Sequence, residues 1–208
     1  MRVPAFVSNG TMVTRTKAFL SILLGAALVS GHASGGAIRG KLECRGAHDC
    51  RDAVIYLTNV PGAFVPRGDS PSIDQFKMEF IPHVLPILLG TTVRILNSDP
   101  VMHNVYTPSN AGDHFNLGTW AKGQAKTYTF KQLGEVRLLC NVHPAMEAWI
   151  LVLPNPHFAR TGPDGVYTLR DVQPGDYELR VWHEKVKFAP IQVHVPAMGE
   201  VVVNPASQ

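Results

Sequence analysis

The sequence is poor in cysteine, in charge and in long apolar runs. Three cysteines among 208 residues are too few for an iron–sulfur cluster. Charged side chains make up 17% of the chain against 45% apolar ones, which excludes wholesale disorder. The one long apolar run, 18–29, is too short to cross a membrane core of about 30 Å. No long segment repeats apolar residues with a helical period, so long helices are not expected.

A charge of one sign is also missing from most of the chain. The formal net charge is +3, but three of the 19 basic residues, Arg2, Arg15 and Lys17, lie in the first 33 residues, which hold no acid. The remainder therefore has 16 basic and 16 acidic residues. Because nucleic-acid affinity comes mainly from neutralising phosphates, this neutral remainder does not support nucleic-acid binding.

The N-terminal segment has the pattern of a secretory signal. Arg15 and Lys17 precede the apolar run, and the small-residue stretch 30–36 follows it. This order is typical of a signal peptide, here predicted over residues 1–33. The mature protein is then expected to be soluble, without a membrane span, and located in the periplasm or secreted.

The rest of the chain predicts an all-β protein. Gly and Pro number 18 and 16, and short apolar or alternating runs lie between them. Such a pattern is typical of β-sandwiches. The expected strands are 37–43, 53–59, 73–81, 83–89, 91–97, 125–131, 135–140, 147–153, 165–170, 176–182, 190–195 and 199–203.

The three cysteines have different expected roles. Cys44 and Cys50 lie six positions apart between two expected strands, so they can face each other across a hairpin. An exported protein permits the disulfide that this spacing predicts. The alternative is a metal site formed by Cys44, His48 and Cys50, which lacks an evident fourth ligand. Cys140 is left over, and a leftover thiol in an exported protein is either reactive or ligating.

Cys140 stands in a loop rich in metal donors. His143 and Met146 follow it within seven residues, and His103 lies 37 positions upstream. Two imidazoles, one thiolate and a weak thioether are the ligand set of a blue-copper site. Zinc prefers a fourth hard or thiolate donor. The sequence therefore predicts one type 1 copper ion, bound by His103, Cys140 and His143, with Met146 as the weak axial ligand.

At these residues the sequence resembles the cupredoxin family. The loop 140–146 is similar in length to that of amicyanin, with Pro144 directly after the histidine. Phe80-Ile81-Pro82, Gly90, and Asn97 with His103-Asn104 are similar to the first half of plastocyanin. The resemblance covers about 72–153, and the whole chain resembles bacterial plastocyanin-like proteins labelled methylamine utilisation proteins. It implies a cupredoxin Greek-key β-sandwich that shuttles single electrons and is not an enzyme.

The resemblance also assigns roles beside the metal. The backbone N–H of Asn104 is expected to point at the Cys140 sulfur, and the Asn104 side chain to tie the two ligand loops together. Asn141 stands where the family has Ser or Thr, so this tie is expected to be rearranged. Leu138-Leu139 replaces the aromatic residue that plastocyanins carry before the cysteine.

The C-terminal part predicts a second small β-sandwich. Asp164-Gly165 and Pro174-Gly175, each followed by an alternating strand, resemble a carboxypeptidase regulatory-like, transthyretin-like sandwich. Residues 34–59 are expected to join 155–208 in this discontinuous domain. The cupredoxin domain, 60–154 with its core at 72–153, is then an insertion at an exposed loop. We expect the second sandwich to lie opposite the metal, which leaves Pro144, Ala145 and the edge of His143 for redox partners.

The sequence leaves alternatives open for the role of His83 and for the function of the protein. His83 is expected at the metal end, as a partner-docking contact, as a group beside the ligands or as a solvated turn residue. Electron transfer between redox protein partners is the favoured function. The alternative is a periplasmic copper carrier or scavenger, which the absence of Met and His tracts disfavours. A copper oxidase or nitrite reductase needs further ligands such as His-x-His, and no such motif occurs.

Overall fold

The computed structural model describes residues 1–2, 35–108 and 113–208. The predicted signal peptide, residues 1–33, lies outside this part of the chain except for Met1 and Arg2. The described residues form strands and connecting loops without a helix, so the predicted all-β class is confirmed. These ranges contain no apolar helix of membrane-spanning length.

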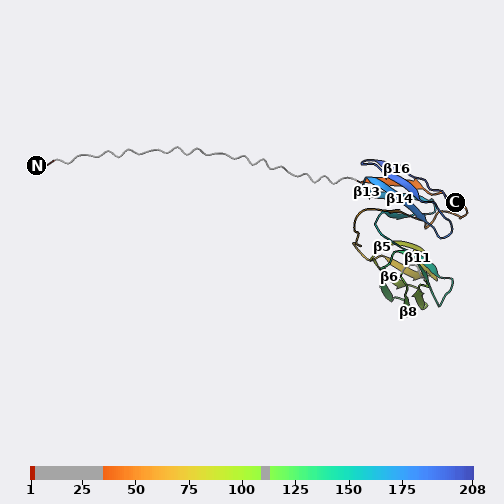
Figure 1. Cartoon of the computed structure of the whole chain (residues 1–208). Helices are drawn as coiled ribbons and strands as arrows, with labels where there is room; N and C mark the ends of the chain where they lie inside the picture. Colours follow the sequence, from red (N-terminus) through yellow and green to blue (C-terminus); the bar gives the residue numbers. More distant parts are fainter. Residues whose placement is uncertain (3–34, 109–112) are drawn as a thin grey trace. The chain divides into compact units, whose positions relative to one another are not determined.

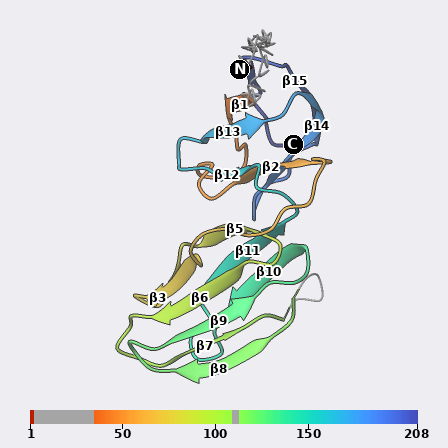
Figure 2. The ribbon, with the colours of Figure 1, turned by 90° about the vertical axis from the view of Figure 1, so that its left-hand side faces the viewer.

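The first sandwich consists of two sheets packed on one core. One sheet has the order β4-β3-β6-β9 and the other β5-β11-β10-β7-β8. Figures 1 and 2 show these strands gathered in one half of the described chain. Their bounds are β3 (Ser72–Phe76), β4 (Glu79–Ile81), β5 (Val84–Leu88), β6 (Thr92–Asn97), β7 (His103–Tyr106), β8 (Asn116–Trp120), β9 (Ala125–Thr129), β10 (Gly134–Leu139) and β11 (Glu147–Leu153).

The first sandwich owes its stability to a buried apolar core between these two sheets. Alternate residues of the facing strands, such as Ile95 in β6 and Ile150 in β11, are fully buried there. Burying a side chain of this size contributes about 1.5–3 kcal/mol. Both sheets are mixed, since β3 pairs parallel with β6 and β5 pairs parallel with β11.

The second sandwich combines residues from both ends of the chain. Its sheets have the orders β13-β1-β16 and β12-β2-β14-β15. Leu57 and Leu179 are fully buried in the core between them. The strands are β1 (Gly36–Lys41), β2 (Val54–Thr58), β12 (Phe158–Arg160), β13 (Val166–Val172), β14 (Gly175–Trp182), β15 (Ile191–Val195) and β16 (Glu200–Val202).

The insertion model requires that the strand near 53–59 pair with strands of the C-terminal part. β2 pairs antiparallel with β14, over Val54–Thr58 against Glu178–Trp182, and also with β12. That required pairing is present. The boundaries 34–59, 60–154 and 155–208 themselves stay a prediction.

A third apolar cluster joins the two sandwiches. Successive residues of β11 face opposite sides: Ile150 enters the first core, whereas Leu151 and Leu153 meet Val54 of β2 and Val84 of β5. A strand that is covered on both faces needs apolar residues at every position, which explains the run in β11. Contacts also reach the end of β5 and β11 beside the metal loop, where Trp149 packs near Trp182 and His83 is 2.9 Å from Glu184. They are not confined to the end opposite the metal loop, so this part of the expectation is wrong.

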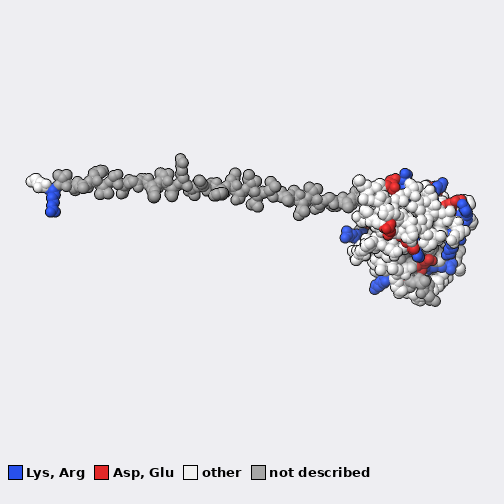
Figure 3. Space-filling model, turned by 45° about the horizontal axis from the view of Figure 1, so that its top comes forward, with Lys and Arg blue, Asp and Glu red and all other residues white. Residues whose placement is uncertain are grey.

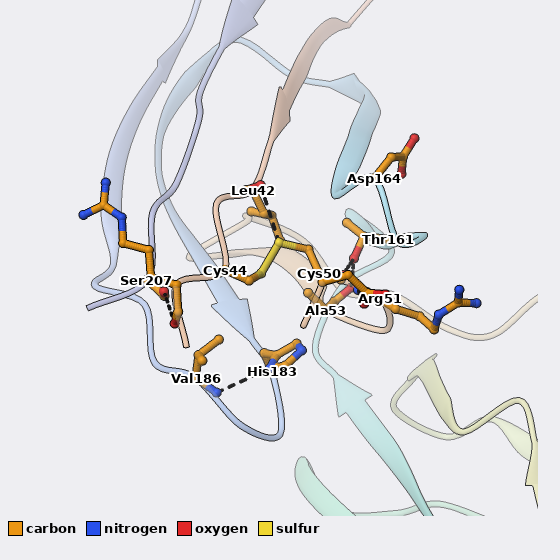
Figure 4. The surroundings of a disulfide bond; sticks show 12 residues. Leu42, Cys44, Cys50, Arg51, Ala53, Thr161, Asp164, His183, Val186 and Ser207 are labelled. Atoms are coloured by element: carbon orange, nitrogen blue, oxygen red, sulfur yellow. Dashed lines mark hydrogen bonds between the residues drawn. A yellow bond between two sulfur atoms is a disulfide. The ribbon is translucent and has the colours of Figure 1, made fainter. Parts of the chain in front are cut away.

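Cys44 and Cys50 form a disulfide that closes the loop after β1 (Figure 4). The Thr161 hydroxyl donates to the carbonyls of Cys50 and Ala53, which ties this loop to the chain beyond β12. Because the two sulfurs are bonded to each other, the alternative metal site with His48 is wrong.

Candidate metal centre

The fold brings the widely separated donors to one end of the five-stranded sheet. His103 is the first residue of β7, and Cys140 directly follows β10. These strands are antiparallel neighbours, with Leu139 opposite Tyr106. Tyr106 is the last residue of β7, so this strand continues past the end of β10, and His103 and Asn104 lie beside Cys140 and Asn141. His143 and Met146 lie in the short loop between β10 and β11.

His103, Cys140 and His143 form a compact donor group. Their nitrogen and sulfur ligand atoms all lie within 4.8 Å of one another. The His103 Nδ1 atom is 3.0 Å from Nδ1 of His143 and 3.9 Å from Sγ of Cys140. His103 and Cys140 are buried, whereas His143 is half-buried. The group therefore has one side that reaches the surface.

Met146 is buried below the same loop. It is 1% exposed and belongs to the core cluster that also contains Cys140. Its backbone N–H donates to the carbonyl of His143 at 3.0 Å, which closes a tight turn. This turn keeps the thioether residue next to the donor group, and its axial role stays a prediction.

Asn104 connects the two donor-bearing segments. Its backbone N–H points at the Cys140 sulfur, with a nitrogen–sulfur distance of 3.5 Å. Its Oδ1 atom accepts the backbone N–H of Asn141 at 3.4 Å, and its Nδ2 atom donates to Asn116 of β8. The tie between the loops thus uses the backbone of residue 141, so the side chain that replaces Ser or Thr is not needed for it.

Asp99 was missed by the sequence reasoning. This buried carboxylate lies in the loop between β6 and β7, and its Oδ2 atom is 2.9 Å from Nε2 of His103. Burial raises the pKa of Asp99, but hydrogen bonds from Met78, His103 and Lys77 together lower it below the ordinary value. Both carboxylate oxygens accept a backbone N–H group, from Lys77 and Met78, which is the bonding pattern of an ionised carboxylate. The sequence feature that could have pointed to this role is an acidic residue, Asp99, four positions before the candidate ligand His103.

The three residues predicted to contact redox partners differ in their exposure. Pro144 and Ala145 are exposed beside His143. His83 is half-buried, and both of its ring nitrogens are engaged within the chain. Nδ1 is 3.1 Å from the carbonyl of Glu147, and Nε2 is 2.9 Å from a carboxylate oxygen of Glu184.

The donor set fits copper. Two imidazole nitrogens, one thiol sulfur and a neighbouring buried thioether combine the borderline and soft donors that copper accepts in both oxidation states. All of them come from one sheet end whose strands are fixed by pairing.

No family model matches the chain, and no curated protein matches it. Similar solved structures include a copper-containing nitrite reductase from Thermus scotoductus SA-01, at 25% identity and a TM-score of 0.40. This match covers 47% of the present chain and only 25% of the reductase chain. The chain therefore corresponds to about a quarter of that enzyme's length.

Two smaller proteins are matched over nearly their whole length. A Cu(I) form of a mutant amicyanin is 24% identical, with 48% of this chain and 98% of that chain covered and a TM-score of 0.38. A purple cupredoxin from Nitrosopumilus maritimus is 24% identical, with 40% and 100% covered and a TM-score of 0.37. The structural neighbours are thus cupredoxins at low identity and partial coverage. Since these three TM-scores are below 0.5, the chemistry of this chain has to be inferred from its own residues.

Proposed function

We propose that the chain is an exported type 1 copper protein that carries single electrons between redox proteins. The observation that carries the proposal is the convergence of one ligand atom each from His103, Cys140 and His143 within 4.8 Å. These three residues would hold the ion strongly, with Met146 as the long axial ligand. When bound, copper would supply a centre that gains or loses one electron.

The chain's contribution to this function is a donor set that stays in place. β10 and β11, which flank the loop 140–146, pair over six residues on each strand. The backbone N–H of Asn104 points at the sulfur of Cys140, and the Asn104 side chain accepts the backbone N–H of Asn141. Donors on paired strands and short hydrogen-bonded loops move little, which keeps the cost of a change in charge low.

The proposed docking surface surrounds the exposed edge of His143. Pro144 and Ala145 are exposed there, and Val142 is 48% exposed. Met102, at 53%, adjoins His103 in the next loop. We infer that redox partners dock through an apolar contact at this loop. Figure 3 shows one face of the described residues, on which basic and acidic side chains are interspersed.

The domain boundaries and the location are part of the proposal. Residues 60–154 would form the copper domain, inserted into a regulatory-like sandwich made of 34–59 and 155–208. Residues 1–33 would direct export to the periplasm or beyond. The Cys44–Cys50 disulfide supports an oxidising compartment.

A copper titration of the metal-free protein tests the proposal. We expect one equivalent of Cu(II) to give an intense blue absorption, because the Cys140 thiolate donates charge to the ion. Cys140→Ser should abolish the colour, and His194→Ala, at an exposed histidine of β15, should leave it unchanged. A colourless complex in the wild-type protein would contradict the proposal. A carrier would in addition surrender its copper to a competing chelator within the mixing time, whereas the buried His103 and Cys140 donors predict slow release.

A further inference from the structure

We propose that Asp99 is a positioning residue, which fixes the nitrogen that His103 presents to the metal site and places a permanent negative charge behind that imidazole. The inference rests on the proposed function, since it concerns the same donor group. It adds a residue outside the loop 140–146 that prepares the site before any metal arrives.

The position of the Asp99 carboxylate is determined by the surrounding backbone. Oδ1 accepts the N–H of Lys77 at 2.6 Å, and Oδ2 accepts the N–H of Met78 at 2.8 Å. The Asp99 backbone N–H is itself 2.9 Å from Oδ1 of Asn97. Asp99 is 4% exposed, so water does not compete for these bonds. The side chain is therefore fixed independently of His103.

A fixed ionised carboxylate dictates the tautomer of the imidazole. A carboxylate only accepts hydrogen bonds, so Nε2 of His103 must carry the hydrogen in the 2.9 Å contact. A neutral imidazole has a single N–H, and Nδ1 is then left with a free lone pair. That lone pair faces Cys140 and His143. Without Asp99, the hydrogen could sit on Nδ1 and block the donor atom.

The same charge affects the two oxidation states unequally. An imidazole that is hydrogen-bonded to a carboxylate is a more basic ligand and stabilises the more positive ion. Asp99 therefore favours the oxidised form of the proposed site and lowers its reduction potential. A purely structural carboxylate would have no such effect.

Asp113 provides a matched control in the same sandwich. It is also 4% exposed, and it accepts backbone N–H groups from Lys131 and Gln132 and the hydroxyl of Tyr128. It thus has the burial and the number of bonds of Asp99, but its partners are not donors of the metal group. Asp99→Asn and Asp113→Asn should cost similar amounts of folding stability.

The test is made on the full chain with two readouts. In the metal-free protein at mildly alkaline pH, nitrogen NMR should show the wild-type His103 protonated on Nε2. Asp99→Asn should introduce the Nδ1-protonated form, and Asp113→Asn should not. With copper bound, Asp99→Asn should weaken affinity by about 10–100-fold and shift the reduction potential upward. Asp113→Asn should leave both unchanged.

Two results would overturn the inference. One is wild-type His103 protonated on Nδ1, which is decisive even if Asp99→Asn fails to fold. The other is a tautomer and a potential that respond no more to Asp99→Asn than to Asp113→Asn. If the wild-type protein binds no blue copper but its His103 tautomer depends on Asp99, the proposed function fails and the positioning role stands. If the blue centre forms without that dependence, the positioning role fails alone.

Discussion

Met146 is the residue whose proposed role differs most from that of its neighbours. It is buried with Cys140 in one core, and a long axial thioether adds density to copper without holding it firmly. We expect Met146→Leu to keep the blue colour and to raise the reduction potential, because the oxidised ion loses a donor. Cyclic voltammetry of the two proteins measures the difference. An unchanged potential would show that Met146 is not the axial ligand.

The candidate ligands could be predicted from the sequence because most of them are local. Cys140, His143 and Met146 share one loop, so their spacing alone places them together. Asp99 could not be assigned, since its role depends on two N–H groups from a turn more than 20 positions earlier. The bonds of His83 depend on Glu147 and Glu184, which are 64 and 101 positions away. Local spacing carries no information on such pairs.

The strands that the sequence indicated are those with apolar or alternating runs, and the missed strands β7, β8 and β12 lack such runs. β8 contains Gly118, with a φ of 70°, in a stretch that reads as a loop. β12 has three residues in a region bounded by prolines. The expected strand 73–81 is instead the hairpin of β3 and β4, whose turn at Lys77 and Met78 has none of the usual turn residues.

That hairpin turn stores backbone strain. Lys77 and Met78 have φ values of 55° and 60°, and both N–H groups bind Asp99. A left-handed backbone costs a residue with a Cβ about 1–2 kcal/mol, and glycine avoids this cost. Glycine loses more conformational entropy on folding, which offsets about 0.5–1 kcal/mol of that gain. Met78→Gly, at an exposed position, should therefore raise the free energy of unfolding by about 0.5–1 kcal/mol in urea titrations.

Glu79→Gly is the matched control for this prediction. Glu79 is exposed in β4 and is not among the residues of positive φ, so glycine should destabilise the protein there. Equal destabilisation by both substitutions would show that the turn is not strained at Met78.

The loop after β14 makes the second sandwich sensitive to acid. Nδ1 of the buried His183 accepts the N–H groups of Lys185 and Val186 at 3.1 and 3.3 Å. Burial lowers the pKa of His183, so its neutral form is favoured in the folded state. This stability is present above the unfolded value of about 6.5 and is lost as the pH falls through the lower folded value.

We therefore expect the free energy of unfolding to decrease from neutral pH toward pH 5. His183→Asn keeps an acceptor near Nδ1 and should reduce the slope by up to one proton, about 1.4 kcal/mol per pH unit. The exposed His194 is the control, and His194→Asn should leave this part of the slope unchanged. Urea titrations at several pH values measure both, and identical slopes in the wild type and His183→Asn would refute the assignment.

At the scale of the whole described chain, the two sandwiches share an apolar interface. Leu151, Leu153, Val54 and Val84 are buried between them, and Trp149 packs against Trp182 with tilted rings whose centroids are 5.6 Å apart. The sequence indicated that both halves were β-sandwiches, but it gave no sign that the outward face of β11 would be covered. Figure 2 shows β5 and β11 on the side of the first sandwich nearest to the second.

Truncation at this interface should destabilise the protein as a core substitution does. Leu151→Ala leaves a cavity between the sandwiches, and we expect it to lower the free energy of unfolding by about 2–5 kcal/mol. Leu133→Ala, at a leucine that is 50% exposed, should change it by less than about 0.5 kcal/mol. Calorimetry of the three proteins checks this. A small effect of Leu151→Ala would mean that the interface contributes little to the fold.

The central claim is that the donor group of His103, Cys140 and His143 supports reversible single-electron transfer. The most direct measurement is a reductive titration of the copper-loaded protein, followed by reoxidation, with the blue absorption as readout. The account predicts bleaching by one electron per protein and full return of the colour, with the copper retained throughout. Loss of copper on reduction, or a centre that does not recover its colour, would contradict it.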